Sequence, residues 1–166
     1  MIKIIEGNIV DAKTDYIIHQ VNCQGEMNTG VAKALRDYDE SIYIHYRNVC
    51  KLREFNPELL LGTYDEYFIR RKNQVILSLF AQDKYGYDGK QYTDLKAFRE
   101  GLNFIRQQIP VYWFDADNRP HKTTIALPYK IGCGRGGADW EVVYKIIEEE
   151  LGIFKVELWK LEEQNV

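Results

Sequence analysis

Residues 123–151 read TTIALPYKIGCGRGGADWEVVYKIIEEEL, where an apolar run, a glycine cluster and a helix-like pattern follow one another. The run 123–128 has the length and composition of a buried strand. Four of the chain's twelve glycines fall within 131–137, where each costs backbone entropy on folding. Asp139 is suited to cap a helix. After it, apolar residues recur at helical spacing, namely Trp140, Val143, Tyr144, Ile147 and Leu151. The stretch therefore predicts a strand, a glycine-rich loop and a helix.

The remaining sequence continues this alternation. Further strands are predicted over short apolar or alternating runs, at 2–5, 16–21, 62–69, 73–80 and 154–161. The run 154–161 alternates, which is typical of an edge strand. One helix is predicted from Val31, with a bend or break at 36–41, and another with Thr93 as its N-cap. Residues 111–122 match no element, and we expect them to form a surface insertion.

Composition and charge limit the class of protein. The 166 residues, 45% of them hydrophobic and 28% charged, suffice for one domain with a core. We predict an α/β fold over residues 1–166, with helices on both faces of a mostly parallel sheet. The net charge of −3 argues against direct binding of nucleic acid or an anionic membrane. The spacing of the three cysteines indicates neither a disulfide framework nor a zinc site, so we expect no metal and no cofactor.

The N-terminal segment also limits the location of the protein. It carries a charge within its apolar stretch and has no small-residue cleavage site, so it does not have the pattern of a signal peptide. No apolar run approaches the roughly 20 residues that span a bilayer. We expect a cytoplasmic monomer.

Two glycine-bearing loops follow predicted strands and precede predicted helices. They are NCQGEMNTG at 22–30 and YKIGCGRGG at 129–137. In α/β sheets, ligands bind outside the carboxyl ends of the strands. A helix N-terminus offers free amides and the positive end of a dipole, so two such loops could hold a diphosphate. Tight turns alone would also explain the glycines. Neither loop has the Walker A or the GxGxxG pattern.

Four segments in this order resemble the macrodomain family of ADP-ribose-binding modules. They are EGNIV, IIHQVNCQGEMNTGVAKAL, LFAQDKYGYDGKQYTDL and LPYKIGCGRGGADWEVV, and together they extend over nearly the whole chain. The pattern I-x-H-x-x-N-C-x-G is similar to that of the branch with ADP-ribose 1''-phosphate phosphatases. Here it consists of Ile17, His19, Asn22, Cys23 and Gly25. The resemblance implies a three-layer α/β/α sandwich around a mixed sheet, with ADP-ribose across the strand ends.

The resemblance also implies binding residues. Adenine would be recognised at Gly7, Asn8 and Ile9, although Asn8 stands where the family more often has Asp. Asn8 could equally be a turn residue. Asn22 would bind the distal ribose, or it could simply tie down its loop. The diphosphate would lie against two loops that comprise Gly25, Gly30, Val31, Ile131, Gly132, Cys133, Gly134, Arg135 and Gly136. Cys23 and Cys133 are interpreted as packed residues rather than nucleophiles.

Candidate catalytic residues follow from the same resemblance. His19 matches a histidine of the phosphatase branch and could transfer a proton, although a hydrogen-bonded core histidine is an equal alternative. Lys84 lies near the lysine of the branch that removes ADP-ribose from macromolecules. The acidic residue of that branch is missing, because Gly136 takes its place. Tyr85 and Tyr92 could border the ligand or simply pack.

Three functions are compatible with these residues. The leading hypothesis is a hydrolase that removes the terminal phosphate of ADP-ribose 1''-phosphate, with His19, Asn22 and Lys84 as the catalytic candidates. The first alternative is a glycohydrolase that removes ADP-ribose from protein or nucleic acid. The second is a reader that binds ADP-ribose or a derivative without turnover.

Overall fold

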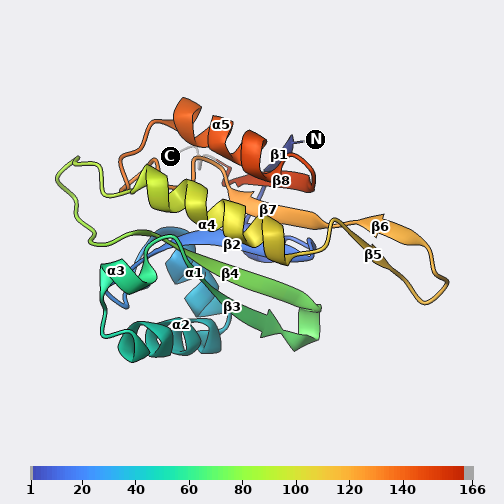
Figure 1. The fold of residues 1–166 in the computed structure, drawn as a ribbon, viewed down its shortest axis with the longest axis horizontal. Helices are drawn as coiled ribbons and strands as arrows, with labels where there is room; N and C mark the ends of the chain where they lie inside the picture. The colour runs from blue at the N-terminus through green and yellow to red at the C-terminus, as the bar shows by residue number, and fades with distance from the viewer. Residues whose placement is uncertain (1, 163–166) are drawn as a thin grey trace.

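A six-stranded sheet forms the centre of the molecule in the computed structural model, which describes residues 2–162 (Figure 1). The strand order is β1-β8-β7-β2-β4-β3, and every neighbouring pair is parallel except β3 with β4. The strands of this sheet are β1 (Ile2–Glu6), β2 (Tyr16–Asn22), β3 (Tyr64–Ile69), β4 (Gln74–Gln82), β7 (Thr124–Pro128) and β8 (Lys155–Lys160). The predicted α/β fold with a mixed, mostly parallel sheet is confirmed.

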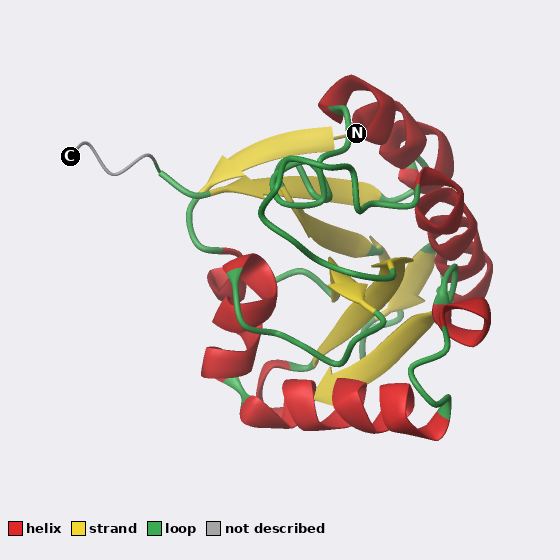
Figure 2. Ribbon diagram, turned by 90° about the vertical axis from the view of Figure 1, so that its left-hand side faces the viewer, coloured by secondary structure: helices red, strands yellow, loops and turns green. Residues whose placement is uncertain are grey.

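Helices cover both faces of this sheet (Figure 2). The α-helices are α1 (Gly30–Tyr38), α2 (Glu40–Leu52), α3 (Pro57–Leu60), α4 (Leu95–Gln108) and α5 (Trp140–Leu151). Two short 3-10 turns, η1 (Ile9–Asp11) and η2 (Arg70–Lys72), complete the helical segments. Within residues 2–162, no helix is both long enough and apolar enough to cross a membrane.

Each face of the sheet has its own core. On one side, α4 and α5 pack on the sheet through residues such as Phe98, Leu102 and Ile147. On the other side, α1 and α2 pack through Leu35 and Tyr46, together with η1. Long runs of strand residues are buried on both faces, as expected for strands covered by two helical layers.

The helix break predicted at 36–41 falls at Asp39. This residue ends α1 and begins α2, because its φ of −153° is extended and its side chain accepts a hydrogen bond of 3.0 Å from the Ser41 amide. An aspartate that can cap a new helix competes with continuing the old one.

Three details differ from the prediction. β8 is not an edge strand: β1 and β7 flank it, and its alternation arises because Val156 and Leu158 face the core under α5. The N-cap of α4 is Asp94, whose carboxylate accepts from the Ala97 amide at 3.0 Å, whereas Thr93 precedes the cap. Residues 111–122 do form an insertion, but one that contains a hairpin.

The hairpin consists of β5 (Tyr112–Phe114) and β6 (Pro120–Lys122) and projects from the body of the molecule (Figure 1). The indole Nε1 of Trp113 donates to Asp15 at 3.2 Å, and the Trp113 ring stacks on His121 at 4.3 Å between centroids. Cross-strand stacking of this kind stabilises a short antiparallel pair, and it joins residues that sequence periodicity does not link.

Candidate functional site

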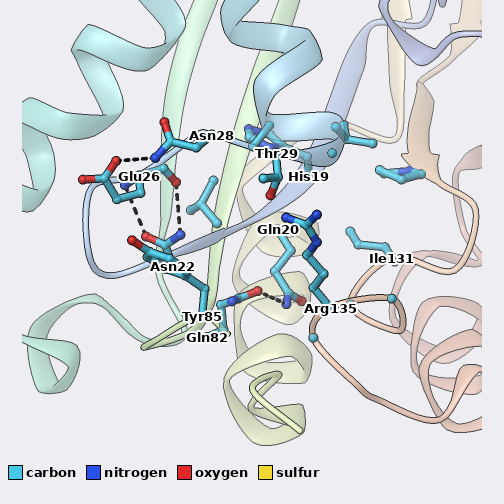
Figure 3. Close-up of a pocket in the computed structure, with 18 of the residues that line it drawn as sticks. His19, Gln20, Asn22, Glu26, Asn28, Thr29, Gln82, Tyr85, Ile131 and Arg135 are labelled. Carbon is cyan, nitrogen blue, oxygen red and sulfur yellow. Dashed lines mark hydrogen bonds between the residues drawn. The ribbon is translucent and has the colours of Figure 1, made fainter. Parts of the chain in front are cut away.

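A cleft of about 530 Å³ lies where β2 and β7, which are parallel neighbours, reach their carboxyl ends (Figure 3). The volume is within the range of roughly 300–1,000 Å³ that is usual for small-molecule sites. Three stretches line the cleft, at 19–32, 82–87 and 128–136. The predicted site residues among the lining are His19, Asn22, Gly30, Val31, Tyr85, Ile131, Gly132, Gly134, Arg135 and Gly136. Both predicted glycine-bearing loops therefore contribute to one cleft.

The N-terminus of α1 forms one wall of the cleft. Thr29, Gly30, Val31 and Ala32 line it, and the first hydrogen bond of the helix runs from the Lys33 amide to the Thr29 carbonyl. Within residues 2–162, the Thr29 side chain makes no capping hydrogen bond. The first amides of α1 are therefore available, and together with the helix dipole they favour an anion at this wall.

The glycine-rich loop 131–137 forms the facing wall. Gly132 has a φ of +75°, which favours glycine. At Gly136 a Cβ would overlap the Thr93 hydroxyl and the Gly132 carbonyl, so the loop can pack this closely only with glycine there. Gly134 is different, because a Cβ at this position would meet no atom within 4 Å. The tight-turn explanation of the cluster holds at Gly132 and Gly136, whereas contact of a ligand with the backbone of this loop stays a prediction.

Charges are distributed unevenly along the cleft. Lys130 and Arg135 bring two cations to the side of the glycine-rich loop. In Figure 3 the Arg135 side chain extends from this loop toward Thr29. Glu26 is the only carboxylate among the described lining residues, and it accepts a hydrogen bond of 2.8 Å from the side-chain Nδ2 of Asn28. A ligand with negative charge near Arg135 suits this arrangement.

His19 lines the cleft but is buried, with 1% of its surface exposed. Its Nε2 is 2.7 Å from the Ser78 hydroxyl, and within residues 2–162 its Nδ1 has no hydrogen-bond partner. Burial lowers the pKa of His19 from 6.5 to about 3, because the interior disfavours the charged imidazolium. His19 is thus neutral at pH 7. A neutral imidazole does not serve as a general acid at pH 7, and its Nδ1 is buried.

The Asn22 amide is largely engaged within its own loop. Its Oδ1 accepts from the amides of Gln24 and Glu26 at 3.0 and 3.3 Å and from the Tyr46 hydroxyl at 2.9 Å. Its Nδ2 donates to the Glu26 carbonyl at 3.0 Å. The loop-tying interpretation describes these contacts, and Asn22 also lines the cleft.

Several predicted residues lie outside the described lining of the cleft. Asn8 caps η1 by accepting from the Val10 amide at 3.1 Å, as its turn-residue alternative predicted, while Ile9 is buried in the core and Gly7 lies against Trp159. Lys84 is exposed on the loop after β4.

Four more predicted positions, Gly25, Cys133, Cys23 and Tyr92, are absent from the described lining. Gly25 is closely surrounded by Arg47 and Phe55. Cys133 is half-buried, and burial raises the pKa of its thiol to about 11. For Cys23, which is fully buried, burial raises the thiol pKa to about 12. Tyr92 donates its hydroxyl to Asp88 at 2.8 Å and is absent from the described lining. Both thiols are poor nucleophiles at neutral pH, in agreement with their interpretation as packed residues.

Some lining residues were not predicted from the sequence. They include Gln20, Glu26, Asn28, Thr29, Gln82, Tyr87, Tyr129 and Lys130. Thr29 and Lys130 could have been recognised, because both lie within the two predicted glycine-bearing loops, at 22–30 and 129–137. Tyr87 could not, because only its contact with Arg135 across two loops brings it to the cleft.

Comparison with known proteins identifies the fold. No protein-family model matches the chain. The structure matches the macrodomain of Thermus aquaticus DarG with a TM-score of 0.72 and 24% identity, over 98% of each chain. It matches Thermosipho africanus DarTG in complex with ADP-ribose with a TM-score of 0.73 and 17% identity, over 99% of this chain and 43% of the other. The chain therefore has the macrodomain fold.

One curated relative is similar in sequence. It is a DNA ADP-ribosyl transferase–DNA ADP-ribosyl glycohydrolase fusion protein of Thermosipho africanus, 21% identical over 154 residues, which cover 86% of this chain. The match spans 37% of the length of that relative. The similarity is thus to a protein named as a DNA ADP-ribosyl glycohydrolase fusion, whereas the pattern formed by Ile17, His19, Asn22, Cys23 and Gly25 resembles the phosphatase branch.

Proposed function

We propose that this chain binds ADP-ribose in the cleft and hydrolyses the bond that joins an ADP-ribosyl group to a macromolecule. The observation that carries the proposal is the pair of facing walls, in which the uncapped N-terminus of α1 lies opposite a glycine-rich loop bearing Arg135. Such walls suit a diphosphate, because amides and a guanidinium can contact its oxygens together. Thermosipho africanus DarTG, which contains a region of similar structure, is in complex with ADP-ribose.

Glycosidic hydrolysis is favoured over phosphate removal by the chemistry of the lining and by the relatives. The oxygen of water would form a bond to C1'' of the distal ribose as the bond from C1'' to the macromolecule breaks. The atom that leaves with the macromolecule would take up the proton that the water loses. Glu26 is our candidate to accept the proton of water, as the only carboxylate among the described lining residues. Phosphatase chemistry with His19 as acid or base has less support, because a pKa of about 3 leaves the imidazole without an acidic proton at pH 7 and makes it a weak base.

A binding module without turnover is the second candidate. The engaged amide of Asn22, the neutral His19 and the exposed Lys84 do not form a catalytic group together. Binding needs only the two walls of the cleft, so it would be compatible with all three observations. On this second proposal, the chain recognises ADP-ribosyl groups and leaves the bond intact.

Two assays on the purified protein test these proposals. Calorimetric titration with ADP-ribose should give a saturable binding curve. Incubation with ADP-ribosylated DNA and with ADP-ribosylated protein should release ADP-ribose, and Glu26→Gln should reduce that release while binding persists. Binding without release of ADP-ribose from either substrate would support the second proposal, a binding module without turnover. Release of phosphate from ADP-ribose 1''-phosphate would support the phosphatase hypothesis instead. Absence of binding would refute the assignment to ADP-ribose altogether.

A further inference from the structure

The loop after β4 brings an exposed tyrosine to the mouth of the cleft. Tyr87 is 71% exposed, yet its ring packs on the guanidinium of Arg135, with 4.3 Å from the Arg135 Cζ to the ring centroid. Both residues line the cleft, one from each of two separate loops. A large aromatic ring that is mostly in water gains little from burial, so its contact with Arg135 is the interaction to be explained.

The two loops are fixed to each other near this contact. The amides of Tyr92 and Thr93 donate to the Gly136 carbonyl at 2.8 and 3.0 Å. The Thr93 hydroxyl donates to the Gly132 carbonyl at 2.8 Å. These bonds join the end of the Tyr87 loop to the glycine-rich loop on both sides of Arg135. They hold the end of the Tyr87 loop beside the loop that carries Arg135.

The contact with Tyr87 leaves the Arg135 guanidinium available to an anionic ligand. Over the described residues 2–162, no carboxylate forms an ion pair with it. A carboxylate would hold the guanidinium equally well but would compete with an anionic ligand for it. An aromatic ring attracts the cation without neutralising it. It also reduces the number of side-chain conformations that Arg135 would lose when a ligand binds.

We propose that Tyr87 is a positioning residue, which holds the Arg135 guanidinium over the cleft so that it contacts the diphosphate of the ligand. The inference rests on the proposed function, because it assumes that ADP-ribose binds between α1 and the glycine-rich loop. Tyr87 acts through Arg135 and needs no contact of its own with the ligand. The ring is the part that matters, and the hydroxyl is dispensable.

A double-mutant cycle tests this role by calorimetric titration with ADP-ribose. Tyr87→Leu should raise the Kd about three- to five-fold, the size expected of an exposed cation–π contact. Tyr87→Phe, which keeps the ring, should leave the Kd within about twofold of the native value. In an Arg135→Ala background, Tyr87→Leu should have no further effect, because the group that it positions is gone.

A matched control variant shows whether the expected loss of affinity is specific to Tyr87. Tyr112→Leu removes another exposed tyrosine, on the hairpin, and should leave both the Kd and the melting temperature unchanged. If Tyr87→Leu weakens binding equally with and without Arg135, the ring contacts the ligand itself and the positioning role is wrong. The role is also wrong if Tyr87→Leu has no effect in either background. If the native chain gives no binding curve, the proposed function fails first and this inference fails with it.

Discussion

Lowering the pH from 7 to 5 should destabilise the folded chain through His19. In the unfolded chain this imidazole titrates near pH 6.5, whereas burial beside Ser78 lowers its pKa in the folded chain to about 3. Between these two values the unfolded state binds a proton that the folded state does not. The contribution of His19 to stability is therefore fully present above pH 6.5 and is lost progressively as the pH falls toward 3.

The size of the effect follows from the two pKa values. Protonation of His19 in the unfolded chain between pH 7 and pH 5 lowers the free energy of unfolding by about 2 kcal/mol. Well below pH 6.5, each further pH unit lowers this free energy by about 1.4 kcal/mol. This figure hardly depends on the folded-state pKa of His19, provided that it stays well below 5. A loss of about 2 kcal/mol is a large part of the stability of an ordinary domain.

Urea unfolding at pH 7, 6 and 5 measures this loss, with His19→Asn as the comparison. The variant lacks the titrating group, so its stability should fall by about 2 kcal/mol less than that of the native chain over this range. His45 and His121 are present in both proteins, and their contributions cancel in the difference. Equal pH dependence of the two proteins, or an imidazole NMR resonance of His19 that titrates near pH 6.5, would refute the burial argument.

Three substitutions probe the walls of the cleft by titration with ADP-ribose. Gly134→Ala should weaken binding about tenfold, because its methyl group would keep a phosphate oxygen from a backbone amide of the loop, the loss of one hydrogen bond to a charged group. The melting temperature should not change, because the methyl group meets no protein atom within 4 Å. Lys130→Ala should weaken binding by an amount that shrinks as salt is added, whereas Lys84→Ala, which removes the same charge outside the described lining, should not. Thr29→Asp should stabilise the protein by about 1 kcal/mol through capping of α1 and yet weaken binding, because the new carboxylate takes the amides that an anion would use. Unchanged affinity in Gly134→Ala, or improved affinity in Thr29→Asp, would contradict the assignment of the two walls.

Local sequence was sufficient for the order of the main elements. A continuous apolar run predicted β2, helical spacing predicted α4 and α5, and Asp39 lay within the predicted break between α1 and α2. The place of β8 in the sheet was not predictable in this way, because pairing with β1 joins the two ends of the chain. Propensity could not choose between Thr93 and Asp94 as the cap of α4, since both residue types cap well and adjacent loops decide which one is used.

For the candidate site, the sequence predicted the two loops but not the contacts of the side chains around them. Both loops were recognised because a glycine cluster after a strand has few explanations, and parallel pairing of β2 with β7 brings the loops to one cleft. The side chains around them depend on contacts that the sequence does not display. Asn8 caps η1, the Asn22 amide bonds within its loop, and Tyr87 reaches the cleft through Arg135. Residue type indicated what each group could bind but not what it already binds.

The capping of the helices explains why this end of the sheet is suited to an anion. At α2, α4 and α5 an aspartate side chain accepts a hydrogen bond from a first-turn amide and places a negative charge at the helix N-terminus. α1 differs, because Thr29 leaves its first amides without a side-chain partner within the described chain, and those amides line the cleft. The helix therefore gives up about 1 kcal/mol of capping energy at the one terminus where a ligand anion could replace the aspartate. A diphosphate bound there would complete a cap that the sequence supplies internally at α2, α4 and α5.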